Sequence, residues 1–127
     1  MSNYRYYNPN PTGKNVGDCT VRALAKALNQ SWEDTFIGLV LYGYMLCDMP
    51  SGNAVWGAYL RSRGFAKRMV SDAYPDSYTA ADFAMENPKG TFVVALSGHV
   101  VCVQNGIIYD SWDSSGEVPL YYWYRRE

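Results

Sequence analysis

Apolar residues near the start of the chain follow a helical period. Between Val21 and Leu28 they recur at the i, i+3, i+4 and i+7 spacing that is typical of a core-facing helix. Asp18 stands in the N-cap position of this helix and Asn29 at its end. The pattern therefore predicts a first helix that packs one face against the core.

The next segment is more uniformly apolar. Ser31 can cap a helix, and Asp34, three residues later, supplies an acidic group in the first turn. A second helix is therefore expected to begin here and to run to about Cys47. It is apolar most of the way round, and we therefore expect it to be buried. Two further helices are predicted over residues 54–63 and 80–86.

The last third of the chain favours strands, because β-branched and aromatic runs alternate there with turn residues. Asn105-Gly106 is a signal for a two-residue type I′ hairpin. Residues 1–17 show no period and are expected to form an irregular arm. The whole of residues 1–127 is thus predicted to be one α+β domain, with N-terminal helices packed on a C-terminal antiparallel sheet. Strands are expected at residues 65–70, 91–96, 99–104, 107–112 and 120–124.

Composition narrows the classes of function. With 127 residues, 48% hydrophobic positions and a net charge of −1, the chain has enough apolar content for a core and too little positive charge to favour nucleic acid as a partner. No apolar stretch is long enough to span a bilayer, and no signal peptide is recognisable at the N-terminus. We therefore expect no membrane association, a cytoplasmic location and free thiols.

Three cysteines and a single histidine supply the candidate chemistry. Cys19, Cys47, Cys102 and His99 have the composition of a zinc site, but no Cys-x2-Cys pair is present, so we expect neither a metal nor a cofactor. Cys47 and Cys102 are interpreted as small buried hydrophobes. Cys19 differs because it lies at the first turn of a predicted helix, where backbone N–H groups and the helix dipole lower the pKa of a thiol.

The hairpin register selects a partner for His99. A two-residue loop at Asn105-Gly106 places His99 and Asp110 as diagonal neighbours on one face of the two strands, whereas Asp113 falls on the other face. A helix-start cysteine, a strand histidine and an aspartate on the next strand supply the nucleophile, base and orienting group of a cysteine triad.

Three short motifs stand at these positions: Gly17-Asp18-Cys19 before a helix, Gly98-His99-Val100-Val101 in a strand, and Asp110-Ser111-Trp112. They resemble motifs of the papain-like cysteine peptidases, where the third reads Asn-Ser-Trp, and the overall pattern is closest to compact bacterial or phage-type members such as the bacteriocin-leader-processing peptidases. The resemblance implies a papain-like fold that acts on a peptide or protein substrate.

The resemblance also implies roles for individual residues. Cys19 would attack a carbonyl, His99 would exchange protons, and Asp110 would orient the imidazole, with Trp112 beside the site. The oxyanion would be held by the Cys19 backbone N–H and one side-chain donor. The family places a glutamine about six residues before the cysteine, where this chain has Gly13; Asn15 is the nearest amide and our candidate donor, and Asn10 is another.

Several functions remain open at this point. The leading expectation is a peptidase or amidase that works through a thioester. The alternatives are an acyltransferase or transglutaminase-like enzyme on the same fold, and a catalytically inactive papain-fold binding module, which the missing glutamine favours. A single-stranded nucleic-acid binder that stacks bases on Tyr4, Tyr6 and Tyr7 is disfavoured by the near-neutral charge. Nothing in the sequence predicts an oligomeric state.

Overall fold

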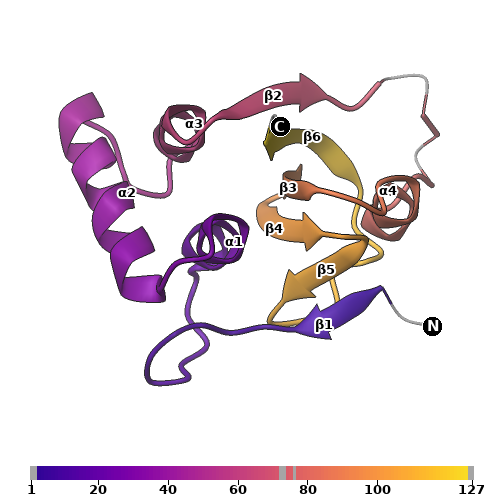
Figure 1. Cartoon of the computed structure of the whole chain (residues 1–127), viewed down its shortest axis with the longest axis horizontal. Coiled ribbons are helices and arrows are strands. Elements are labelled where there is room, and N and C mark those ends of the chain that lie inside the picture. Colours follow the sequence, from indigo (N-terminus) through magenta and orange to yellow (C-terminus); the bar gives the residue numbers. More distant parts are fainter. Residues whose placement is uncertain (1–2, 72–73, 76, 126–127) are drawn as a thin grey trace.

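The chain folds as four helices and a six-stranded sheet, as seen in a computed structural model that describes residues 3–71, 74–75 and 77–125 (Figure 1). The ends of the predicted 1–127 domain therefore lie outside the described residues. The helices are α1 (Cys19–Leu28), α2 (Trp32–Leu46), α3 (Asn53–Ser62) and α4 (Ala80–Glu86). The strands are β1 (Tyr4–Tyr6), β2 (Phe65–Met69), β3 (Thr91–Leu96), β4 (His99–Gln104), β5 (Ile107–Asp110) and β6 (Pro119–Arg125).

The sheet has the order β1-β5-β4-β3-β6-β2, and every neighbouring pair is antiparallel except β1 and β5. The predicted α+β class is confirmed, and so are the four helices and the five predicted strands to within two residues at each end. The strand predicted over residues 107–112 is two residues shorter in the structure, where β5 ends at Asp110.

Local signals explain these boundaries. The Ser31 hydroxyl accepts a hydrogen bond from the Asp34 N–H at the start of α2, as the sequence predicts. Asn29 ends α1 in the left-handed conformation at φ 53°. Asn105 and Gly106 both have positive φ, so the β4–β5 turn is the expected type I′ hairpin, with Gln104 paired to Ile107.

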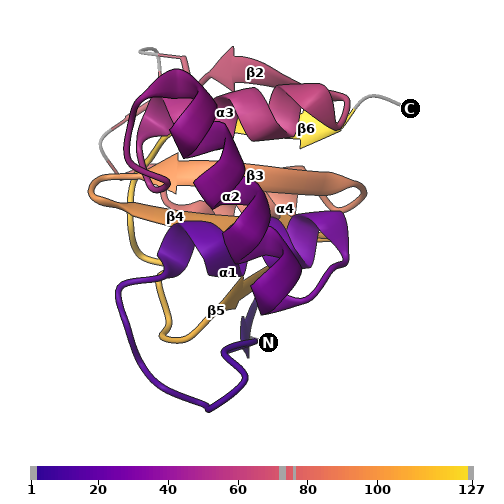
Figure 2. The same ribbon diagram turned by 90° about the vertical axis from the view of Figure 1, so that its left-hand side faces the viewer.

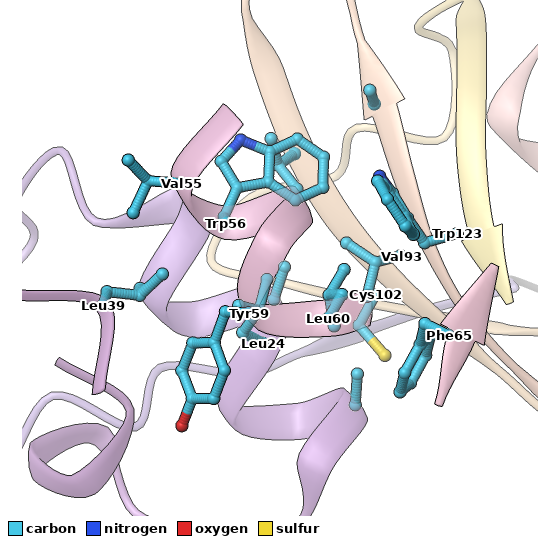
Figure 3. Close-up of a cluster of buried hydrophobic side chains, with 14 residues drawn as sticks. Leu24, Leu39, Val55, Trp56, Tyr59, Leu60, Phe65, Val93, Cys102 and Trp123 are labelled. Carbon is cyan, nitrogen blue, oxygen red and sulfur yellow. The ribbon is translucent and has the colours of Figure 1, made fainter. Parts of the chain in front are cut away.

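Helices cover both faces of the sheet. α1 and α3 pack on one face, and their cluster with the sheet includes Leu24, Trp56 and Trp123 (Figure 3). α4 covers the other face through Phe83 and Ala84. α1 lies between the sheet and α2, and α2 crosses the outside of α1 and α3 (Figures 1 and 2).

The prediction that α2 is buried is wrong. Only Thr35, Leu39 and Gly43 are buried, a stripe with four-residue spacing that faces α1 and α3. Trp32 and Tyr42 are partly buried, and the other large apolar side chains of α2 are exposed, up to 57% for Ile37 and 82% for Tyr44. The helix is apolar nearly all round but has neighbours on one side only, because it forms the outermost layer.

The prediction of a wholly irregular arm is also wrong. Residues Tyr4–Tyr6 form β1, which pairs in parallel with β5 at the edge of the sheet. A three-residue strand carries too little alternation to be detected by periodicity. No helix among the described residues has the length and apolar character needed to cross a membrane.

Candidate active site

The first turn of α1 presents Cys19 at the surface of the sheet. The helix begins at Cys19, and Asp18 is its N-cap residue by backbone position. The first N–H groups of a helix have no acceptor within the helix, so the Cys19 thiol lies where partial positive charge gathers. The Asp18 side chain does not cap these groups, however, because it is engaged elsewhere.

The β4–β5 hairpin brings His99 and Asp110 together. The Nε2 atom of His99 lies 2.6 Å from Oδ2 of Asp110, as the predicted hairpin register requires. Asp113, which the register excluded, instead accepts a hydrogen bond from the Ser115 N–H in an exposed turn. The structure therefore joins the two residues that the sequence paired.

Asp110 is fully buried and each of its carboxylate oxygens has two partners. Oδ2 meets His99 and accepts a hydrogen bond of 2.6 Å from the Ser114 hydroxyl. Oδ1 accepts hydrogen bonds from the Arg22 guanidinium at 3.0 Å and from the Ser111 N–H at 2.7 Å. Four partners around one carboxylate leave it little rotational freedom, so its position relative to His99 is well defined.

Arg22 is a residue of the site that the sequence prediction missed. Its buried guanidinium binds Asp110 on the hairpin at 3.0 Å and Asp18, the N-cap residue of α1, at 2.6 Å. Arg22 therefore links the start of α1 to the hairpin. The other oxygen of Asp18 accepts a hydrogen bond of 2.8 Å from the Trp32 indole. One signal was available, since Asp18 and Arg22 have the i, i+4 spacing of a helical ion pair. The partner 88 residues away gave no signal at all.

Charge and hydrogen bonding shift the pKa values of all three candidate residues. Burial alone raises the pKa of the Cys19 thiol, but hydrogen bonding with His99 and the Val100 N–H, and the nearby positive charges, bring it below its usual value. Burial lowers the pKa of His99, yet the interactions with Asp110 and Cys19 prevail and raise it to about 9. These opposite directions favour a thiolate–imidazolium pair.

Asp110 is the counter-charge for this pair. Burial raises the pKa of its carboxyl, while hydrogen bonds from His99, Ser114 and the Ser111 N–H outweigh burial and lower it below its usual value. The group therefore carries a full negative charge beside the imidazole at neutral pH.

β1 and the residue that follows it hold the backbone of Asp110 in place. The Tyr7 N–H donates to the Asp110 carbonyl at 2.7 Å, and the Tyr4 hydroxyl donates to the same oxygen at 3.3 Å. The segment predicted to be an irregular arm is thus part of the support of the site.

Two open hollows flank the Cys19–His99 pair. One, the β6-side hollow, extends toward Ser51, Asn53 and Tyr121, and the other, the arm-side hollow, extends toward Asn15, Ser111 and Trp112. Both hollows share a common lining of Gly17, Cys19, Gly98 and His99. The thiol and the imidazole are therefore accessible from two sides, as a chain lying across the site would require.

The remaining predicted site residues surround this pair. Trp112 is partly exposed, and its ring centroid lies 4.9 Å from that of His99. Asn15 is exposed and lines the arm-side hollow, whereas the Asn10 side chain is occupied by hydrogen bonds from Thr12. Asn53, which the sequence prediction missed, lines the β6-side hollow and accepts a hydrogen bond of 3.1 Å from the Trp56 indole.

The other two cysteines differ from each other. Cys102 is fully buried, as predicted, and burial raises its pKa to about 12. The prediction that Cys47 is buried is wrong, because it ends α2 in a left-handed conformation at the exposed surface. Among the described residues, no group of three or more His, Cys, Asp or Glu side chains is arranged to hold a metal ion.

Comparison of the chain with protein-family models, curated proteins and solved structures gives no significant match.

Proposed function

We propose that this protein is a cysteine hydrolase of the papain-like type that cleaves a peptide or amide bond through Cys19, His99 and Asp110. The observation that carries the proposal is the contact of 2.6 Å between His99 Nε2 and Asp110, on an imidazole that lines the same two hollows as the Cys19 thiol. Covalent acyl transfer needs a nucleophile, a base beside it and a carboxylate that orients the base.

The first half of the reaction forms a thioester. The Cys19 thiolate attacks the substrate carbonyl carbon and forms a carbon–sulfur bond. The tetrahedral intermediate then expels the amine, which takes its proton from the His99 imidazolium. Asp110 stabilises the imidazolium before this transfer and occupies Nε2, so that Nδ1 is the ring nitrogen left for exchange with the sulfur.

The second half of the reaction uses water. The now neutral His99 removes a proton from a water molecule, whose oxygen attacks the thioester carbonyl. Collapse of the second intermediate breaks the carbon–sulfur bond, releases a carboxylic acid and restores the thiolate–imidazolium pair. Both intermediates carry an oxyanion that the Cys19 backbone N–H can stabilise from the start of α1. Asn15 lines the arm-side hollow and Asn53 the β6-side hollow, so each is a candidate for the second, side-chain donor.

Competition between the two thiols tests this proposal directly. Cys47 is more exposed than Cys19, so accessibility alone predicts that Cys47 reacts first with iodoacetamide. Because the thiolate is the reactive form, we expect Cys19 to be alkylated at least about tenfold faster than Cys47 at pH 6. Mass spectrometry of the digested protein measures both sites in the same sample.

His99→Ala serves as the matched variant. It should remove the advantage of Cys19 at pH 6 and leave the rate at Cys47 unchanged. Preferential labelling of Cys47 in the unaltered protein, or an advantage of Cys19 that survives His99→Ala, would show that no thiolate–imidazolium pair exists. With a peptide amide as substrate, the product mass in the presence of a primary amine separates hydrolysis from acyl transfer.

A further inference from the structure

One edge of the sheet is open to a further strand. β2 is the last strand of the sheet, and among the described residues it pairs only with β6 (Figure 1). The Val70 N–H donates a hydrogen bond of 3.1 Å to the Leu120 carbonyl, which continues the β2–β6 register. Because the residues of an antiparallel strand alternate between its two sides, Lys67 and Met69 direct their backbone N–H and C=O groups to the open side. These groups can pair with an incoming strand.

Basic residues gather at this edge. Arg61 and Arg63 stand at the C-terminal end of α3, Lys67 and Arg68 in β2, and Arg125 at the end of β6. They are five of the eleven Lys and Arg residues of the chain, whereas α3, β2 and β6 contain no Asp or Glu. All five are exposed, and none forms an ion pair with a described residue. Although the net charge of the chain is −1, these five residues and β2, here called the basic edge, are therefore strongly positive.

Each cation of the basic edge lies over an aromatic ring. The Lys67 Nζ atom is 4.3 Å from the centroid of the Tyr121 ring, and the Arg68 guanidinium carbon is 5.2 Å from that of Tyr124. The other three are placed in the same way, at 4.9–5.0 Å. These contacts restrain long side chains before any partner binds, and they cover ring faces on which nucleic-acid bases could stack. The basic edge therefore favours a carboxylate over a base.

The same charges select the occupant. The basic edges of two copies of the chain would repel each other, so a second copy is a poor partner for β2. A strand added beside β2 would place its side chains alternately on the two faces of the sheet, next to Lys67 on one face and Arg68 on the other. A strand with acidic side chains on both faces would thus pair with the backbone of β2 and with its cations together.

We propose that the basic edge is a docking site for an extended, acidic segment of a partner protein, which joins the sheet as a strand beside β2. His99 lies on β4, which is three strands away from β2 in the sheet, or roughly 14 Å. Docking therefore leaves the Cys19–His99 pair accessible, and the inference does not depend on the proposed hydrolase activity.

Labelled peptides test the proposal by fluorescence anisotropy. The probe is Val-Glu-Glu-Val-Glu-Glu-Val, which carries acidic side chains on both faces of a strand, and its analogue with Gln in place of Glu should bind at least about tenfold more weakly. Two further peptides keep every charge but are N-methylated at alternate residues, in complementary sets. The set whose N–H groups would face β2 should bind at least about tenfold more weakly than the other, because its ladder hydrogen bonds are lost. Equal affinities of the two would show attraction by charge alone and overturn docking as a strand.

Variants of the protein locate the site. Lys67→Glu combined with Arg68→Glu should weaken binding of the probe at least about tenfold. Lys14→Glu combined with Lys89→Glu makes the same change of charge at two exposed positions elsewhere, and should leave the affinity within about twofold. Met69→Pro removes an N–H from the open side, where an edge strand tolerates proline, so it should weaken binding at least about threefold, whereas Met69→Thr should not.

Three outcomes would overturn the proposal. Equal losses in the two double variants would show a general effect of net charge. Tighter binding of an oligothymidylate with the same number of negative charges would assign the basic edge to nucleic acid. Cys19→Ser should bind the probe as tightly as the unaltered protein, and a dependence on Cys19 would place the peptide in the candidate active site. Failure of the docking site in any of these ways leaves the hydrolase proposal standing, because that proposal is tested by alkylation of Cys19.

Discussion

The first two helices follow one another in the chain but relate to the core in opposite ways. α1 has ten residues, and six of them are buried, including the charged Arg22. α2 has fifteen residues and is far more apolar, yet only three of them are buried. α1 lies between the sheet and α2, whereas α2 has the rest of the protein on one side only (Figure 1).

The difference shows that a helix is buried by its place among the layers and not by its own hydrophobicity. The sheet face offers α1 a hairpin with a buried carboxylate at its end, so that a charged residue can be accommodated there. α2 finds only the outer surfaces of α1 and α3, and one stripe is enough to hold it. The remaining apolar surface of α2 is left for solvent or for a partner.

The largest effect on stability is expected at Arg22. Arg22→Met should lower the free energy of unfolding by about 3–5 kcal/mol, because the buried carboxylates of Asp18 and Asp110 would both lose the guanidinium that binds them. Urea denaturation measures the change. Lys26→Met is the control on the same helix, where loss of the contact with the Tyr109 ring should cost about 1 kcal/mol or less. Equal losses for the two variants would contradict the role assigned to the buried network.

Removal of one leucine from each helix tests the comparison next. Leu24→Ala on α1 should destabilise the protein by about 2–5 kcal/mol, since Leu24 is fully buried. Leu41→Ala on α2 should change the stability by no more than about 0.5 kcal/mol, because Leu41 is more than half exposed. Comparable losses in urea denaturation would mean that α2 is covered in solution, for instance by a second copy of the chain.

The charge balance at the start of α1 can be measured through the single histidine. NMR titration should give the His99 imidazole a pKa of about 9. In Asp110→Asn the carboxylate that favours the protonated ring is lost, so the pKa should fall by at least about one unit, or about 1.4 kcal/mol. In the proposed reaction the amine is expelled with a proton from the imidazolium, so turnover should decline as the pH rises through about 9, and at lower pH in the variant. A His99 pKa that is unchanged by Asp110→Asn would show that Asp110 does not stabilise the protonated imidazole.

The smallest change in stability is expected on the outer face of α2. Ile37→Gln combined with Leu41→Gln should leave the urea midpoint nearly unchanged, because both side chains are exposed. Binding of the dye ANS, which reports accessible apolar surface, should fall in the same variant. A strong loss of stability would show that this face is buried in the protein as it exists in solution.

Much of the fold could be predicted from the sequence because its signals are local. Capping residues, a glycine after α3 and the Asn105-Gly106 turn each define a boundary within a few residues. The same hairpin pairs His99 with Asp110, which are eleven positions apart in the sequence. Two of the three proposed triad residues can therefore be predicted from the register of one hairpin.

The rest of the structure depends on contacts between distant parts of the chain. The exposure of α2 and of Cys47 follows from which surfaces the other elements leave free, and no local pattern encodes that. Arg22 looks like an ordinary member of a helix until Asp110 is placed against it from 88 residues away. β1 is defined by its parallel partner β5 and not by its own three residues.

The support that β1 gives to Asp110 has a consequence for the order in which the site is assembled. The hairpin that joins His99 to Asp110 closes locally, whereas the hydrogen bond from Tyr4 to Asp110 spans 106 residues. During synthesis, the N-terminal segment and Cys19 leave the ribosome long before the strands that they need, and such non-local contacts form late. The nascent chain therefore carries an ordinary thiol at Cys19, and the surroundings that lower the pKa of this thiol form only when β4 and β5 have folded against α1.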